Sequence, residues 1–315
     1  MGESIESTNA FERVIKRIRN DGVYHPRDQR VSTQLGLEIL RDLYFVSPEF
    51  REDVNCGRIC YGFNLKFEKT STSNSKRTDL AIGVLDESAD IPPILTKYLE
   101  DAPLIPEMKM LHITTRDRDL MKEVRIAMEN KSVITAHRNR NNRSDELVSI
   151  ADVLSEACPG AILVATVMIG TATEFLNYEV LQRAEGVLEV FCERVRGGYQ
   201  LDEIKRLLGR SAPEIADFLN QPRIRKALIS TNESQEPFNT MDRMHGVLKP
   251  RENTSQIGYD VLILQFCHID NIGPARLESP EYFKGIYAQY QYNTALKRLS
   301  GLYRERFAKS NGSIV

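Results

Sequence analysis

The chain has 315 residues, 41% of them hydrophobic, so it can bury a core for one large domain or two medium ones. Its 42 Lys and Arg against 44 Asp and Glu give a net charge of -2, which excludes a uniformly basic surface and restricts any polyanionic partner to a local basic patch. No run of about 18 apolar residues predicts a membrane span, and the N-terminus shows no secretory signal, so we expect a cytoplasmic protein with no membrane partner.

The first half of the chain predicts one helix followed by strands. Residues 32–50 place apolar side chains at helical spacing, as in a helix that packs on a sheet. Residues 57–68 and 78–86 are rich in β-branched and aromatic residues and predict two neighbouring strands joined by a polar loop. Residues 88–122 contain four prolines, which predicts an irregular insertion around a short strand near 110–114.

The next part of the chain adds a strand, a helix and another strand. Residues 124–131 are apolar up to a polar end and predict the first of these strands. The expected helix is capped by Ser144 and ended by Pro159 and Gly160, and the apolar run 161–171 predicts a strand covered on both faces. The order helix, three strands, helix, strand predicts an α/β (α+β) fold with a mixed sheet flanked by helices.

The remaining sequence is mainly helical. Helical patterns fill residues 175–230, a further strand is expected at 259–270, and an amphipathic helix at 292–307. The run 201–228 resembles a helix-turn-helix, although Lys205 stands where that motif has a small residue. A plain helical hairpin explains the same run.

Charged residues gather where two predicted strands end. Alternation along the later strand places four side chains on one face: Arg125, Ala127, Glu129 and Lys131. Glu129 and Lys131 therefore project together, and Asp79 stands at the mouth of an earlier strand. An E-x-K pair on an edge strand can be a solvated ion pair, but carboxylates that converge from adjacent strands suit Mg²⁺, and a nearby lysine can orient a water molecule.

This pattern resembles the PD-(D/E)XK nuclease superfamily: Asp79, then Glu129-Asn130-Lys131 on the next long strand, then a polar loop and a helix. The run ENKSVITAHRNRNNRSDEL is similar to the same region of some type II restriction endonucleases. The resemblance implies an αβββαβ core, Mg²⁺ as cofactor, double-stranded DNA as substrate and a homodimer. By position, Asp79 and Glu129 would ligate the metal and Lys131 would assist the attacking water. The chain departs from the pattern with Thr78 in place of proline and with 50 positions between Asp79 and Glu129.

Other residues become candidates through this resemblance. Polar and basic side chains after the E-x-K strand are expected to contact DNA: His137, Arg138, Arg140, Asn142 and Arg143. Glu38, in the first core helix, is a secondary candidate for a metal or water ligand.

The sequence thus predicts three regions and one activity. Residues 1–30 form an N-terminal helical segment, 31–175 a nuclease core with an insertion at 88–122, and 176–315 a candidate subdomain for DNA recognition and dimerisation. The expected function is that of a type II restriction enzyme, a Mg²⁺-dependent endonuclease that cuts duplex DNA at a specific short sequence. Two alternatives stay open: a DNA-binding regulator built around 201–228, and a structure-specific repair or defence nuclease of the same fold.

Overall fold

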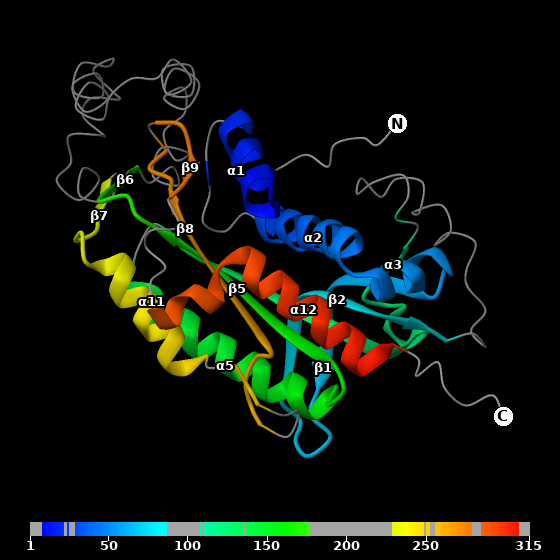
Figure 1. The fold of residues 1–315 in the computed structure, drawn as a ribbon. Coiled ribbons are helices and arrows are strands. Elements are labelled where there is room, and N and C mark those ends of the chain that lie inside the picture. The colour runs from blue at the N-terminus through cyan, green and yellow to red at the C-terminus, as the bar shows by residue number, and fades with distance from the viewer. Residues whose placement is uncertain are drawn as a thin grey trace, which may run out of the picture.

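A seven-stranded mixed sheet forms the centre of the computed structural model, in the strand order β3-β1-β2-β4-β5-β8-β9 (Figure 1). The structure describes residues 8–21, 24, 29–86, 108, 110–134, 137–176, 229–248, 250–252, 256–271, 273–278 and 285–308. The strands of the sheet are β1 Ile59–Glu68, β2 Ser75–Leu85, β3 Leu111–Ile113, β4 Met121–Val133, β5 Ile162–Gly170, β8 Val261–His268 and β9 Arg276–Leu277. A separate antiparallel pair joins β6 Glu174–Leu176 to β7 Ile229–Thr231.

Pairing changes direction across the sheet. Strand β2 is antiparallel to both β1 and β4, whereas β4, β5 and β8 are mutually parallel and β3 is parallel to β1. All nine residues of β5 are buried, as expected of a strand with helices on both faces. The α/β class with a mixed sheet flanked by helices is therefore confirmed, as is the short strand within the proline-containing insertion.

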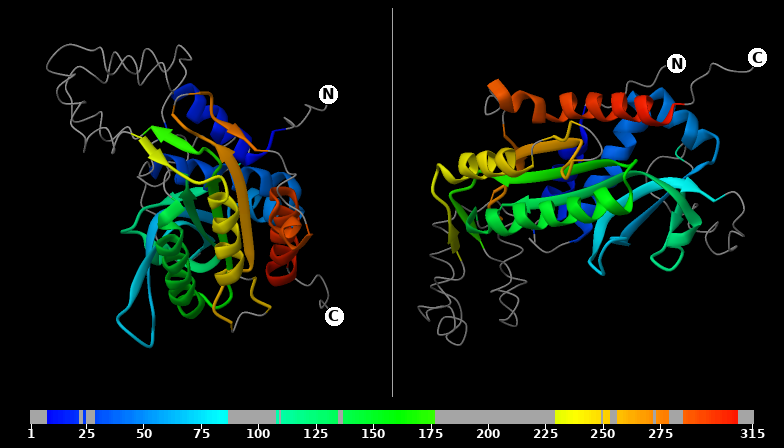
Figure 2. Two further views of the ribbon diagram at one scale, coloured as in Figure 1. Left: turned by 90° about the vertical axis from the view of Figure 1, so that its left-hand side faces the viewer. Right: turned by 90° about the horizontal axis from the view of Figure 1, so that it is seen from below.

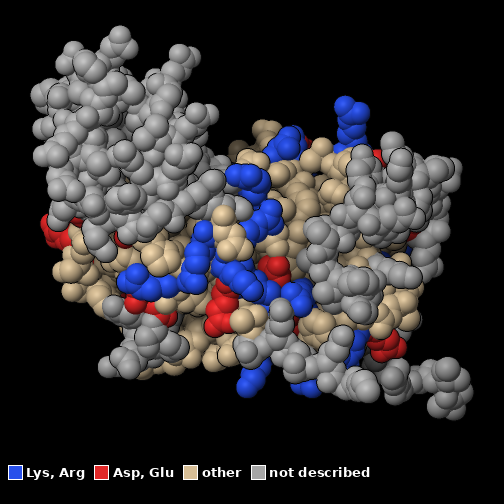
Figure 3. Space-filling view, turned by 90° about the horizontal axis from the view of Figure 1, so that it is seen from above, with Lys and Arg blue, Asp and Glu red and all other residues tan. Residues whose placement is uncertain are grey.

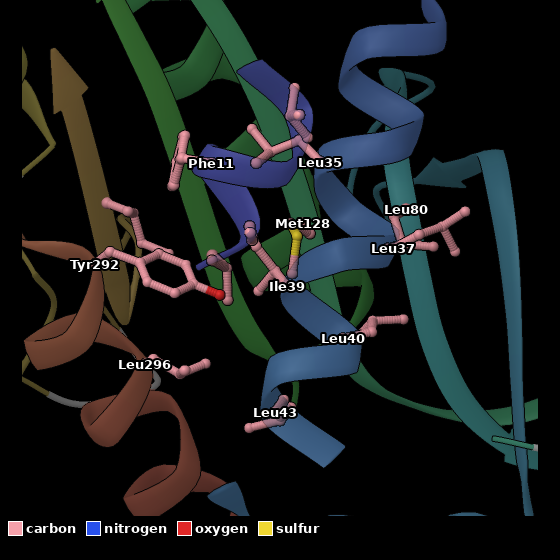
Figure 4. Close-up of a cluster of buried hydrophobic side chains, with 14 of the residues drawn as sticks. Phe11, Leu35, Leu37, Ile39, Leu40, Leu43, Leu80, Met128, Tyr292 and Leu296 are labelled. Atoms are coloured by element: carbon pink, nitrogen blue, oxygen red, sulfur yellow. The ribbon is translucent and has the colours of Figure 1, made fainter. Parts of the chain in front are cut away.

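Helices cover both faces of the sheet, as Figure 2 shows. One hydrophobic cluster joins a first face to α1 Ala10–Asp21, α2 Gln29–Val46, α3 Pro48–Asn55 and α12 Tyr292–Phe307. A second cluster joins the opposite face to α5 Arg140–Ala157 and α11 Glu236–Val247. Short 3-10 turns lie at Arg118–Leu120, His137–Asn139 and Gly285–Tyr290. In Figure 4, Phe11, Leu35 and Tyr292 bring α1, α2 and α12 into one core.

Helix α5 begins earlier than the sequence predicts. Its first residue is Arg140 and its N-cap is Asn139, so the polar segment expected to be a loop is largely helical. Ser144, expected as the cap, is buried inside the helix, where its hydroxyl donates to the carbonyl of Asn141. The predicted end is confirmed, because the helix stops at Ala157 before the Pro-Gly pair.

A β-bulge changes the face on which Arg125 lies. The register of β2 against β4 shifts between Ile82 and Gly83, which interrupts the alternation of side chains. As a result Arg125 contacts the buried Asp53 and Tyr303 on the α3 and α12 side. The prediction that it shares the face of Glu129 is therefore wrong.

The C-terminal region contributes to the central sheet. Strand β8 pairs along its length with β5, so the described part of 176–315 shares the sheet with the region expected as the core. The helix-turn-helix-like run 201–228 lies outside the described residues. Within the described part of the chain, no helix combines the length and apolar character needed to cross a membrane.

Candidate active site

The candidate site lies where strands β2 and β4 separate. Their paired register ends at Leu80 and Met128, whereas β4 continues beside β5 as far as Val133. One further link closes the fork, because the hydroxyl of Thr78 donates to the carbonyl of Met128 over 2.9 Å. A fork between two strands leaves backbone groups without ladder partners, and in a buried position these need polar side chains.

The carboxylates of Asp79 and Glu129 accept hydrogen bonds from backbone amides at the fork, and these hydrogen bonds bring the two side chains together. The amide of Asp79 donates to Glu129 Oε2 at 3.1 Å, and the amide of Asn130 donates to Asp79 Oδ2 at 2.8 Å. Asn130 also fixes helix α2 above the fork, because its side-chain amide donates to the carbonyl of Ser32. The convergence of two carboxylates from adjacent strands, predicted from the expected neighbouring strands, is present in the structure, although both residues lie within their strands where β2 and β4 part.

Lys131 joins the carboxylates, together with a residue that sequence reasoning missed. Its Nζ donates to Glu129 Oε1 at 2.5 Å and to Glu146 Oε1 at 3.1 Å. Glu146 lies on α5 and also accepts from Arg143 at 3.1 Å. The sequence did contain a signal for Glu146, namely an acidic residue in the second turn of the helix after the E-x-K strand. Recognising that signal required knowing that α5 begins at Arg140.

The carboxylates of this cluster carry more charge than their partners neutralise. Asp79, Glu129 and Glu146 face Lys131 and Arg143, which leaves one negative charge in excess. Burial and the neighbouring Asp79 raise the pKa of Glu129 to about 7, although Lys131 opposes the shift. Burial likewise raises the pKa of Asp79. Burial would lower the pKa of Lys131, but the charges of Glu129 and Asp79 raise it overall, so the lysine stays protonated.

A cavity of about 210 Å³ opens beside the fork. Its lining comes from Tyr24, the start of α2, strands β2, β4 and β5, and the start of α5: Tyr24, Gln29, Val31, Ser32, Leu35, Asp79, Asn130, Lys131, Ser132, Arg143 and Met168. Asp79 and Lys131 are therefore reachable from this space, whereas only 2% of Glu129 is exposed. The volume is sufficient for hydrated ions and a phosphate group.

The donor set fits a hard divalent cation. No group of three or more His, Cys, Asp and Glu arranged to hold a metal occurs among the described residues. Mg²⁺ is nevertheless commonly bound by one or two carboxylates, with water and substrate phosphate as its other ligands. The excess negative charge of Asp79 and Glu129, and their raised pKa values, are what a bound cation would relieve.

His137 is not placed to contact DNA. Its ring is 1% exposed, and both nitrogens are engaged: Nδ1 with the hydroxyl of Thr240 at 2.7 Å and Nε2 with the carbonyl of Gly170 at 2.8 Å. Burial lowers its pKa. The expectation of a DNA contact is corrected here: His137 anchors the turn before α5 to β5 and α11.

The other residues expected to contact DNA lie in different environments. Arg140 forms an ion pair with Glu236 on α11, and Asn142 is exposed on α5. Arg143 reaches the cavity, as expected of a phosphate contact. The side chain of Arg138 lies outside the described residues.

Glu38 is directed away from the fork. Its carboxylate accepts from Arg13 Nε at 2.5 Å and from Gln34 Nε2 at 2.6 Å, so it links α2 to α1. The structure does not bring this secondary candidate to the site.

None of the protein-family models, curated proteins or solved structures compared with this chain matches the chain.

Proposed function

We propose that the fork is the active site of a Mg²⁺-dependent endonuclease that hydrolyses phosphodiester bonds of double-stranded DNA. The observation that carries the proposal is the meeting of Asp79, Glu129 and Lys131 at a cavity, with carboxylates in excess of cations. A buried cluster of carboxylates that combines excess negative charge, raised pKa values and access to a cavity favours a role in binding an external cation.

In this proposal Asp79 and Glu129 hold the metal. When bound, Mg²⁺ supplies positive charge that polarises the scissile phosphate and lowers the pKa of a coordinated water molecule. Lys131 is placed to hold the attacking water and to stabilise charge that develops on the phosphate oxygens. Arg143, at the rim of the cavity, would hold a neighbouring phosphate.

Glu146 acts as a positioning residue in the same proposal. It holds Lys131 from the α5 side while Glu129 holds it from the strand, so the ammonium group has two fixed partners. A neutral Glu146→Gln side chain would retain a hydrogen-bond acceptor and lose the charge that favours protonated Lys131. We expect a moderate loss of rate and an acidic shift of the pH profile.

The wider arrangement is compatible with a restriction-endonuclease-like assignment. The elements α2, β1, β2, β4, α5 and β5 follow the order αβββαβ, with α3 and the short strand β3 as additions between them, and their strands are neighbours in the sheet. Sequence-specific cleavage and a homodimer belong to the same proposal, because one site per chain cuts both strands of a palindrome only when two chains act together.

The test is incubation of several plasmid and phage DNAs with the purified protein in Mg²⁺ or in EDTA. Lys131→Ala and Glu129→Gln should each reduce cleavage about 10²- to 10⁴-fold. Lys122→Ala and Glu123→Gln are matched controls, because both residues are exposed at the other end of β4. Discrete bands would support sequence-specific cleavage, and a smear would favour a structure-specific nuclease. Intact DNA with folded wild-type protein in Mg²⁺ would overturn the proposal.

A further inference from the structure

Helix α1 presents a basic outer face. Its apolar side buries Phe11, Val14 and Ile18, whereas Lys16 and Arg17 are exposed, and Arg17 Nη1 donates to Gln34 Oε1 on α2 at 2.6 Å. Four of its twelve residues are basic and two are acidic, in a chain whose net charge is -2. Figure 3 shows Lys and Arg gathered in a band over this part of the molecule.

The helix contains two kinds of arginine. Arg13 is half-buried between the carboxylates of Glu38 and Asp42, so its charge is neutralised within the fold. Arg19 instead donates from Nε and Nη2 to the carbonyl of Ala275, which fixes the side chain without cancelling its charge. The side chain of the next residue, Arg276 on β9, is 52% exposed, and its Nη2 lies 3.5 Å from Glu278 Oε1. The outer face of α1 and Arg276 therefore form one basic surface, which we call the α1 face.

A series of contacts connects the α1 face to the cavity. Tyr24, shortly after α1, is held at its backbone by Asn271, which accepts from the Tyr24 amide and donates to its carbonyl, both at 2.8 Å. The hydroxyl of Tyr24 donates to Ser132 at 2.6 Å, and Ser132 follows Lys131 on β4. Tyr24 itself lines the cavity. A residue shortly after the end of α1 therefore lines the cavity.

We infer that the α1 face binds the sugar-phosphate backbone of duplex DNA outside the cavity. The inference rests on the proposed function, because it takes the substrate of the fork as the occupant. A helix of twelve residues is about 18 Å long, and one DNA strand carries about five phosphates over that axial distance. Exposed Lys and Arg along such a helix suit contacts that position a duplex without reading its bases.

The chain offers a matched pair of variants. Lys16-Arg17 on α1 and Lys297-Arg298 on α12 are the same dipeptide, exposed on two helices of the same helical layer. Lys16→Glu/Arg17→Glu and Lys297→Glu/Arg298→Glu change the net charge equally. Only the first pair lies on the α1 face.

Binding is measured by fluorescence anisotropy with a labelled 30-base-pair duplex in EDTA, where cleavage does not interfere. Lys16→Glu/Arg17→Glu should weaken binding at least about tenfold and reduce the slope of log K against log salt by about two. The Lys297→Glu/Arg298→Glu control should bind like the wild type. Equal effects of the two double variants, or unchanged binding by the first, would overturn the inference.

Cleavage in Mg²⁺ separates this inference from the proposed function. If the wild-type protein binds DNA through the α1 face and leaves the DNA intact, the proposed nuclease activity is refuted and DNA binding by the α1 face is supported. If the Lys16→Glu/Arg17→Glu variant cleaves DNA with an unchanged KM, DNA binding by the α1 face is refuted and the proposed nuclease activity is supported. The result expected when both hold is a raised KM with kcat close to that of the wild type.

Discussion

Two buried ion clusters at opposite ends of the parallel strands differ in the sign of their excess charge. Asp260, just before β8, is 2% exposed and accepts from Arg251 Nη2 at 2.7 Å, Arg306 Nη2 at 2.5 Å and the amide of Leu163 at 2.7 Å. Burial would raise its pKa, but these hydrogen bonds lower it overall. At the fork, by contrast, the pKa of Glu129 is raised to about 7.

The difference separates a structural cluster from a candidate functional one. At Asp260 two arginines meet one carboxylate, and the group ties the starts of β5 and β8 to α12. At the fork three carboxylates share two cations beside a cavity. The fork also lies at the carboxyl ends of parallel strands β4 and β5, where open α/β sheets commonly bind ligands.

The largest expected effect belongs to the cluster around Asp260. Asp260→Asn should lower the free energy of unfolding by about 3–5 kcal/mol, because it leaves the buried guanidinium of Arg251 without its carboxylate. The measurement is urea denaturation, with Arg243→Met as control. Arg243 pairs with Asp145 at the surface, so its loss should cost less than about 1 kcal/mol. Similar costs for the two variants would contradict the assignment of a structural role to Asp260.

The fork should make the protein less stable as pH rises. Glu129 has a raised pKa in the folded state, so between about pH 4.5 and 7 the folded protein binds more protons than the unfolded chain. The free energy of unfolding should therefore fall through this window by about 3 kcal/mol. The free energy of unfolding is measured by urea denaturation from pH 5 to 8 for the wild type and for Glu129→Gln. The difference between the two proteins at each pH isolates the contribution of Glu129 from that of His137. Parallel pH profiles of stability for the two proteins would refute the raised pKa of Glu129 and the excess of negative charge at the fork.

A divalent cation should restore part of that stability. At pH 8, Mg²⁺ at about ten times its dissociation constant should stabilise the wild type by about 1.4 kcal/mol, a Tm increase of about 2–4 °C. Asp79→Asn should abolish the increase and Glu123→Gln should preserve it. An equal increase in both variants would show that Mg²⁺ binds elsewhere.

The smallest effect is expected at the rim of the cavity. Tyr24→Phe removes the hydrogen bond to Ser132 and should cost about 1 kcal/mol of stability. Tyr44→Phe is a matched control, because it removes a hydrogen bond to Asn55 on the α2–α3 side. Both variants should lose similar stability, but only Tyr24→Phe should reduce cleavage, by severalfold. An unchanged cleavage rate for Tyr24→Phe would remove this residue from the site.

The sequence alone determined the α/β class and the shared face of Glu129 and Lys131. Strand alternation is local, so it fixes which neighbours of Glu129 share its face wherever the strand remains regular. The same reasoning failed at Arg125, because a bulge depends on how β2 pairs with β4. Local rules therefore placed Glu129 and Lys131 together, whereas the approach of Asp79 and the irregularity at Arg125 both depend on how β2 pairs with β4.

Only the tertiary structure decided the roles of residues whose partners are distant in sequence. His137 is buried because Thr240 and Gly170 occupy both ring nitrogens, and Glu38 is turned toward Arg13 on α1. Glu146 reaches Lys131 because α5 begins before the expected cap. The burial of a polar side chain and its hydrogen-bond partners depend on packing between elements, which residue spacing within one segment does not specify.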